Sequence, residues 1–215
     1  EAISQIYRQA LEEAGVPLEE IGAVAVTYAP GLIGAVLVGV SFAKSVAYAL
    51  GVPLIPVHHV RGHIAANYLA HPDLEPPFVC LCVSGGTSLL VDVKGYTEME
   101  ILGATRDDAA GECFDKIARV MGLGYPGGAP LDRAAQGGND KAFSLPRVHI
   151  QDAPLDMSFS GLKTAMLNLI HNAQQKGEEL PVADLAASFS AAVSEELVPR
   201  TMAAAQAKGY GKVAV

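Results

Sequence analysis

The feature that most constrains the fold is an apolar segment between residues 23 and 57. The stretch AVAVTY at 23–28 predicts a strand, and a glycine-rich turn, APGLIG, follows it. Residues 35–50 form a continuous apolar run that ends at Gly51 and predicts a buried helix, and PLIPV predicts a second strand. Because a strand, a helix and a strand follow one another, the two strands are expected to be parallel. The sequence therefore predicts an α/β fold.

The rest of the chain is divided by HPDLEPP, residues 71–77, whose prolines are expected to mark a domain boundary. Three strands then follow in quick succession, FVCLCV, SLLVDV and EMEIL, and SGGT and KGYT between them are typical of β-hairpin connections. Pro199 is expected to kink or split the last helix. The remaining predicted elements are helices at 3–14 (ending at Gly15), 59–70, 107–122, 160–175 and 182–207, a loop-rich region at 123–159, and a final KVAV strand.

Composition narrows the class of protein. A net charge of −8 over 215 residues argues against a broad basic surface for nucleic acid, although a local basic patch is compatible with it. The apolar run at 35–50 contains Lys44 and is shorter than the roughly 20 residues of a membrane helix, so no membrane span is predicted. No signal segment is recognisable, and the expected compartment is the cytoplasm. The chain opens without Met and stops within a predicted strand, so it is expected to be a fragment.

The cysteines are too few and too scattered for a disulfide framework. Cys80, Cys82 and Cys113 are all expected to be reduced. Cys80 and Cys82 alternate along a predicted strand and are expected to point to opposite faces.

The first candidate site is PVHHVRGHIAA, residues 56–66. On a helix His59 and His63 are four residues apart and share a face, with Cβ atoms roughly 5 to 6 Å apart, which suits two ligands of one metal ion. His58 is expected to point elsewhere. Zinc peptidases with an HExxH helix have a general-base Glu where Val60 stands here. The alternative is a pair of ordinary helix histidines at a domain boundary, and a metal would need a third ligand from elsewhere.

The second candidate is VSGGTS at 83–88, between two predicted strands. Glycines without side chains let backbone N–H groups approach an anion closely, and concave runs of amides hold phosphates. A β-hairpin also favours glycine for its turn, so this segment has an ordinary structural explanation as well.

The third candidate is RDDAAGECFDKIARVMG, residues 106–122. Asp108, Glu112 and Asp115 are expected on one face of an amphipathic helix, where carboxylates can bind ribose hydroxyls or metal-bound water. The alternative is a solvated acidic row with Lys116 and Arg119 as its partners. A glycine inside a helix destabilises it by up to about 1 kcal/mol, so Gly111 is expected to mark a close approach.

A second turn follows the acidic helix. YPGGAPLDRAA supplies Gly127, Gly128 and Asp132, which can close over a ligand. The same segment also suits a turn before a helix that binds nothing.

Four blocks in this order resemble the TsaD family of tRNA N6-adenosine threonylcarbamoyltransferases, formerly labelled O-sialoglycoprotein endopeptidases. They are PVHHVRGHIAA, CVSGGTSLLV, DDAAGECFDKIARVMGLGYPGGAPLD and DMSFSGLKTA. The resemblance implies an actin-like, sugar-kinase-like ATPase (ASKHA) fold of two similar α/β domains with a cleft between them. Residues 1–75 would be the later part of the first domain, and 76–215 would belong to the second.

The resemblance also implies an activity and a site. The family transfers a threonylcarbamoyl group from threonylcarbamoyl-adenylate to N6 of the adenosine next to the anticodon of tRNA. His59 and His63 match its metal-binding histidines, and the implied cofactor is one divalent ion, iron or zinc, with iron favoured. No residue is identified as a general base. The positions that match the family's substrate-binding residues are Cys82, Val83, Ser84, Gly85, Gly86, Asp115, Gly128 and Asp132.

The implied partners are tRNA, the adenylate, the small non-catalytic paralogue and a P-loop ATPase of the same pathway, without a membrane. Contact with tRNA is expected mainly through Arg and Lys side chains near the cleft, such as Arg61 and Arg106.

The sequence departs from the family in three respects. The opening glycine-rich segment is missing, and a later Asn-Gly-Gly loop with a metal-binding Asp would lie beyond Val215. Thr87 stands where bacterial members usually have His. The chain alone is therefore expected to be inactive.

Three other functions compete with the transferase. A metallopeptidase would need a carboxylate beside the histidines, a sugar or acetate kinase would need phosphate motifs that are not visible, and a non-catalytic scaffold paralogue would not be expected to keep both His59 and His63.

Overall fold

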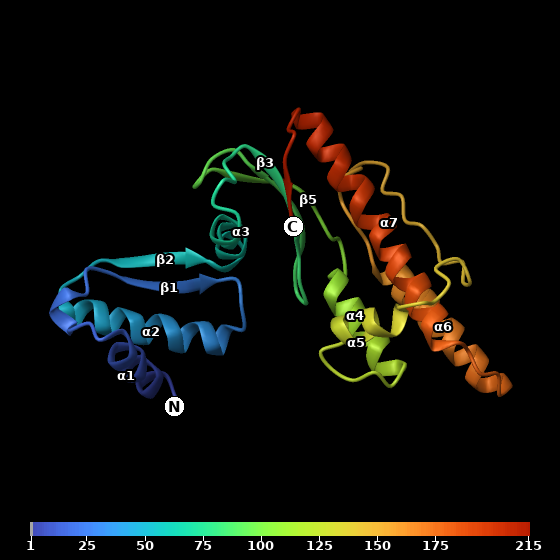
Figure 1. Cartoon of the computed structure of the whole chain (residues 1–215), viewed down its shortest axis with the longest axis horizontal. Helices are drawn as coiled ribbons and strands as arrows, with labels where there is room; N and C mark the ends of the chain where they lie inside the picture. The colour runs from blue at the N-terminus through green and yellow to red at the C-terminus, as the bar shows by residue number, and fades with distance from the viewer. Residues whose placement is uncertain (1) are drawn as a thin grey trace. The chain divides into compact units, whose positions relative to one another are not determined.

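The computed structural model describes residues 2–215, and it divides into two compact units on either side of the Pro72–Asp73 bond (Figure 1). The secondary structure mixes helices with one parallel and one mostly antiparallel sheet, as an α/β chain requires. The assignment of the two units to actin-like domains stays a prediction.

The first unit is built around the predicted strand, helix and strand. β1 (Val24–Ala29) and β2 (Leu54–His58) are parallel neighbours, and α2 (Ile33–Leu50) connects them. α1 (Ile3–Ala14) and α2 both end at a glycine in the left-handed conformation, Gly15 and Gly51. A short 3-10 helix (Leu18–Glu20) precedes β1, and α3 (His59–Ala70) follows β2 directly. The predicted element order and the parallel pairing are confirmed.

The predicted burial of α2 is wrong. Only Ala43 and Ala47 are buried, whereas Ile33 and Tyr48 are 86% and 90% exposed. An apolar run predicts a helix, but its burial depends on how many other elements cover it; the covering elements here include the two strands and α1, whose Tyr7 ring lies 5.5 Å from that of Phe42. By length and composition alone α2 could cross a membrane, a weak criterion that the core helix of a soluble protein also meets.

The second unit contains a sheet of four strands in the spatial order β5, β4, β3, β6. β3 (Phe78–Val83), β4 (Ser88–Val93) and β5 (Met99–Ala104) form the predicted antiparallel hairpins. β6 (Val213–Ala214) is the predicted last strand, and it pairs in parallel with β3.

Four helices complete the second unit: α4 (Ala110–Val120), α5 (Gly128–Ala135), α6 (Ser160–Lys176) and α7 (Val182–Lys208). The main core joins β3 and β4 to α4, α5, α6 and α7, and its members include Val79, Leu90, Ile117, Leu131, Phe159, Met166, Phe189 and Val193. Burying this apolar surface is the main favourable term in folding.

The helices depart from prediction in three places. α4 begins at Ala110 rather than at residue 107, and α5 lies inside the region expected to be loop-rich, where no helix was specified. α7 runs through Pro199 as one helix, so the expected split is wrong, whereas a kink at the proline stays a prediction. There the Arg200 and Thr201 side chains donate to the carbonyls of Glu196 and Leu197, four residues earlier in each case.

The expected orientation of two cysteines is also wrong. Cys80 and Cys82 lie on the same face of β3, with their Sγ atoms 4.0 Å apart. Side chains alternate with a period of two along a strand, so residues two apart share a face. All three cysteines are unpaired thiols.

Gly103 offers a test of the packing behind β5. A Cβ atom at this position would lie 2.2 Å from the Leu155 carbonyl oxygen, so Gly103→Ala should lower the free energy of unfolding by about 1–3 kcal/mol. In the β4–β5 turn a Cβ on Gly95 would meet nothing closer than 3.8 Å, so Gly95→Ala is the matched control. Urea unfolding of both variants measures the difference, and equal midpoints would contradict this packing.

Candidate functional site

The two predicted metal-binding histidines lie at the start of α3, both exposed. Their Nε2 atoms face each other at 3.0 Å, and the ring centroids are 4.4 Å apart. His58 ends β2 and lies near Tyr28 instead, with 6.2 Å between the rings. The helix therefore brings His59 and His63 together in the way their spacing predicts.

The geometry of this pair fits a shared metal ion. Imidazole nitrogens bind zinc at about 2.0–2.1 Å, so two neighbouring ligands are separated by about 3 Å or slightly more. The pair can also share a proton as a hydrogen bond when one ring is protonated at Nε2. Within residues 2–215 no group of three or more His, Cys, Asp or Glu side chains is gathered for a metal. The metal role of the pair stays a prediction.

The second unit holds the predicted substrate-binding turn between β3 and β4. The Ser84 N–H donates to the Thr87 carbonyl at 2.7 Å, which closes the turn. Gly85 and Gly86 at its tip are exposed, and along the described chain their amides have no hydrogen-bond acceptor. Cys82, half-buried, and Val83, 37% exposed, precede the turn at the end of β3. The tip of the turn thus carries two N–H groups without an acceptor among the described residues, and the Gly85 nitrogen lies beside Gly111 of α4.

The fold itself does not require glycine at the tip of this turn. A Cβ atom on Gly85 or Gly86 would meet nothing within 4 Å, and neither residue has a positive φ. Gly128 has the same freedom, as do Gly22, Gly34 and Gly211. Of these six glycines, Gly85, Gly86 and Gly128 coincide with predicted substrate-binding positions, and the other three do not. Close approach of a ligand to the backbone would explain glycine there.

Gly111, in contrast, is required by packing. Its N–H donates to the Ser84 carbonyl at 3.2 Å, and a Cβ atom would lie 2.4 Å from that oxygen. The expected close approach at Gly111 is confirmed, and its partner is the backbone of the turn. α4 therefore starts in direct contact with the β3–β4 connection.

One turn further along α4, Asp115 holds the next predicted segment. Its Oδ1 accepts the Gly127 N–H at 2.6 Å, and Gly127 is so close to α4 that a Cβ would lie 2.6 Å from the Phe114 carbonyl oxygen. Gly128 begins α5, and Asp132 lies one turn later on the same helix, exposed. The structure thus brings Asp115 next to the Gly127–Gly128 segment and places Asp132 on α5.

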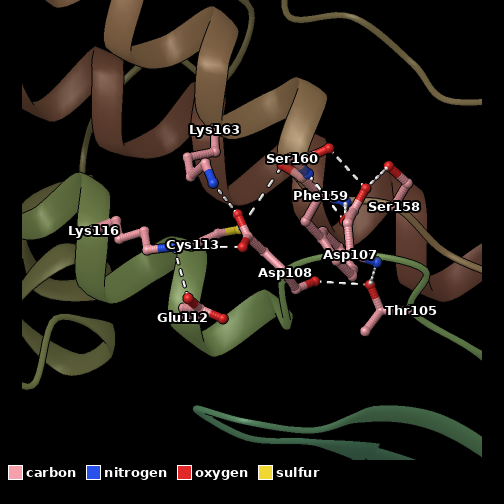
Figure 2. Close-up of polar contacts among 10 residues, drawn as sticks. All are labelled: Thr105, Asp107, Asp108, Glu112, Cys113, Lys116, Ser158, Phe159, Ser160 and Lys163. Atoms are coloured by element: carbon pink, nitrogen blue, oxygen red, sulfur yellow. Dashed lines mark hydrogen bonds and ion pairs between the residues drawn. The ribbon is translucent and has the colours of Figure 1, made fainter.

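The predicted acidic face of α4 is partly wrong. Asp108 precedes the helix and forms an ion pair with Lys163 of α6, while Lys116 lies 3.4 Å from Asp108 and 2.6 Å from Glu112 (Figure 2). Arg119, expected to pair with these acids, instead lies over the Tyr125 ring at 5.8 Å. A hydrogen bond from Lys163 lowers the pKa of Asp108, against the opposing effect of burial. Asp108 and Glu112 therefore have structural partners.

Sequence reasoning missed Asp107, which anchors the start of α6. It accepts the N–H groups of Phe159 and Ser160 at 2.8 and 3.2 Å, and the hydroxyls of Ser158 and Ser160 (Figure 2). Burial raises the pKa of Asp107, but these hydrogen bonds outweigh it and the net shift is downward. The two motifs that contain these residues, RDD and DMSFSG, were both visible in the sequence, but their contact was not.

Arg106, a predicted tRNA contact, already has a partner. Its Nε donates to Asp156 at 2.8 Å, and Asp156 also accepts the Ala104 N–H at 3.1 Å. Arg200 fixes the preceding loop by donating to the carbonyls of Asp156 and Val148 at 2.7 and 3.0 Å. These contacts hold DMSFSG beside the segment that leads into α4.

Comparison with known proteins places the chain among its relatives. The family model "TsaD: tRNA N6-adenosine threonylcarbamoyltransferase" matches residues 1–215. The chain belongs to the TsaD family. The tRNA N6-adenosine threonylcarbamoyltransferases of Clostridium botulinum (strain 657 / Type Ba4) and Clostridium perfringens (strain 13 / Type A) are each 51% identical to it over 215 residues. These alignments cover 100% of this chain and 63% of each relative, so the chain spans less than two thirds of their length.

Two solved structures from Pseudomonas aeruginosa also match part of the chain. One is described as YeaZ, with a TM-score of 0.36, and the other as an uncharacterized protein with similarity to peptidase YeaZ, with a TM-score of 0.35. Each is 20% identical and covers 46% of this chain, with 48% and 46% of the respective structures covered. A likeness this low carries no argument, so membership of the TsaD family rests on the sequence comparisons.

The ion pair between Asp108 and Lys163 predicts how stability depends on pH in this TsaD family member. Because the folded-state pKa of Asp108 is lowered, its contribution is present above the unfolded value of about 3.9 and is lost as the pH falls further. Asp108→Asn should be less stable than the parent at pH 7, and the difference should shrink toward pH 3. Urea unfolding at both pH values measures this, with Glu112→Gln, which removes a carboxylate that pairs with Lys116 within α4, as the control for the loss of an ion pair that does not reach α6. An equal deficit at both pH values would argue against the ion pair.

Proposed function

We propose that the protein containing this chain transfers the threonylcarbamoyl group from threonylcarbamoyl-adenylate to N6 of the adenosine adjacent to the anticodon of tRNA. The observation that carries the proposal is 51% identity over all 215 residues to transferases of this name. The proposed partners are tRNA, the adenylate, the small non-catalytic paralogue and a P-loop ATPase. We place the reaction in the cytoplasm and assign the two units to an actin-like fold.

The proposed substrate site has two parts in the second unit. The amides of Gly85 and Gly86 bind the anionic part of the adenylate, because both residues are exposed and no described residue accepts from their N–H groups. Asp115 accepts from the ribose hydroxyls through Oδ2 while Oδ1 holds Gly127. Gly128 and Asp132 complete the nucleoside side of the site, and Cys82, Val83 and Ser84 line the strand end that leads to the turn.

The proposed metal site is the pair His59 and His63. Each ring must carry no proton on Nε2 to bind an ion there. The 3.0 Å distance between the two Nε2 atoms supports one ion shared by both rings. The ion is divalent, iron in preference to zinc. When bound, it supplies Lewis-acid polarisation of a carbonyl or phosphate oxygen.

Positioning carries much of the proposed rate enhancement. The exocyclic amine of adenine is a poor nucleophile, and no side chain of the described residues is assigned as its general base. Holding the amine and the acyl carbon in contact converts a bimolecular step into an effectively unimolecular one. Backbone donors at Gly85 and Gly86 would stabilise the charge that develops on the departing phosphate.

Complementation tests the transferase and the histidines together. The complete gene, expressed in cells depleted of their own enzyme, should restore threonylcarbamoyl-adenosine in tRNA, measured by nucleoside mass spectrometry. His59→Ala with His63→Ala should abolish the modification and the bound metal, because both nitrogens that face each other are removed. His71→Ala, at the exposed end of α3, is the matched control and should retain both.

The outcomes of this test separate the two claims. If the parent protein is well expressed but restores no threonylcarbamoyl-adenosine, the transferase proposal is wrong and a scaffold function is favoured. Stoichiometric metal in the double variant, by elemental analysis, would remove the histidines from the metal site even if the transferase proposal survives.

Asp115 provides a separate test of the nucleoside site. Asp115→Asn keeps an oxygen for the Gly127 N–H but loses the charge that strengthens hydrogen bonds to hydroxyls. We expect adenylate affinity, measured by calorimetry, to fall about 10- to 100-fold, since a hydrogen bond to a charged group contributes roughly 1.5–3 kcal/mol. Glu112→Gln, one turn earlier on α4, should leave affinity unchanged. Unaltered affinity in Asp115→Asn would exclude the proposed contact.

A further inference from the structure

Ser88, the first residue of β4, is outside the predicted substrate-binding set but is fixed against it. The side chain is almost fully buried, with the whole residue 1% exposed. Its Oγ accepts the N–H of Ala110, the first residue of α4, at 2.9 Å. Its carbonyl oxygen accepts the Thr105 N–H at 3.0 Å. One residue thus holds both the start of α4 and the segment that leads to it.

The contact with α4 replaces a local helix cap. The N-cap residue Ala109 has no side chain that can accept a hydrogen bond, so the first amides of α4 need acceptors from elsewhere. Ala110 obtains one from the Ser88 hydroxyl, and Gly111 obtains one from the Ser84 carbonyl. Ser84 and Ser88 are the two ends of the β3–β4 turn. The helix start is therefore hydrogen-bonded to both ends of the turn, and the tip between them carries no such bond.

We propose that Ser88 is a positioning residue for substrate binding: its buried hydroxyl fixes the β3–β4 turn on α4, so that the Gly85 and Gly86 amides stay oriented toward the anionic part of the adenylate. The inference rests on the proposed function and extends it to a residue that touches no substrate. The tip has only the Ser84–Thr87 hydrogen bond of its own, so its orientation depends on the anchors at its two ends.

The test measures the KM for threonylcarbamoyl-adenylate, and calorimetric affinity for the same compound, in the full-length protein. Ser88→Ala removes the acceptor and should raise both KM and Kd by tenfold or more while the kcat falls less. Ser88→Thr keeps a hydroxyl at the same place and should restore both constants to within about threefold of the parent. This rescue separates the loss of the hydroxyl from a general effect of substitution.

Ser188 provides the matched structural control. It is also buried, 2% exposed, and its hydroxyl accepts a backbone N–H, that of Phe143 at 3.2 Å, far along the chain from the turn. Ser188→Ala should shift the unfolding midpoint as Ser88→Ala does, yet leave KM and Kd unchanged. If Ser88→Ala does not fold, Ser88→Cys, which keeps the volume but is a weak acceptor, takes its place in the comparison.

Three results overturn the inference. Unchanged KM and Kd in a destabilised Ser88→Ala would reduce Ser88 to a structural residue, while the proposed function stands. Equal increases in KM for Ser88→Ala and Ser188→Ala would show a general loss of folded protein. If the parent protein binds no adenylate, the proposed function fails and the positioning role fails with it.

Discussion

The second unit depends on the contact between the start of α4 and the β3–β4 turn. Here two backbones meet without a side chain between them, since Gly111 donates to Ser84 and a Cβ at Gly111 would overlap the Ser84 carbonyl. Backbone N–H groups at a helix start need acceptors, and the two ends of the turn supply them: the Ser84 carbonyl accepts from Gly111, and the Ser88 hydroxyl accepts from Ala110. The same contact fixes where α4 begins, and thereby where Asp115 meets the Gly127–Gly128 segment.

Glycines in the site fall into two physical groups. Gly111 and Gly127 permit α4 to touch its neighbours, and any larger residue would collide with backbone atoms. Gly85, Gly86 and Gly128 have open space around them and ordinary backbone angles. The fold explains the first group, whereas the fold does not require glycine at the second, where close approach of the proposed substrate would explain it. This division supports the proposed assignment of Gly85, Gly86 and Gly128 to substrate binding, and it assigns Gly111 and Gly127 to packing.

Periodicity and glycine placement predicted most of the elements. The parallel pair β1–β2, the hairpins of β3 to β5 and the left-handed ends at Gly15 and Gly51 follow from local sequence alone. The burial of α2 was predicted wrongly, because an apolar run does not determine how many other elements pack against the helix. The shared face of Cys80 and Cys82 was predictable from strand geometry, and the prediction misapplied it.

The candidate site was only partly predictable. The pairing of His59 with His63 and the close approach at Gly111 followed from helical spacing and from the rarity of glycine within helices. The roles of Asp107 and Asp108 did not, because their partners on α6 lie more than 50 residues away in sequence and no local pattern links them. The sequence predicted an acidic helix face at this point. In the structure Asp107 instead anchors the start of α6, and Asp108 forms an ion pair with Lys163 of the same helix.

The contacts at Gly111 and Gly127 also have a mechanical consequence. A side chain between two elements can change rotamer and absorb a small displacement, but two backbones in van der Waals contact cannot. A ligand that pulls the β3–β4 turn inward by a fraction of an ångström would therefore shift α4 as a rigid rod. The far contact of that rod is the segment at Gly127–Gly128, so the two halves of the proposed substrate site would close in concert.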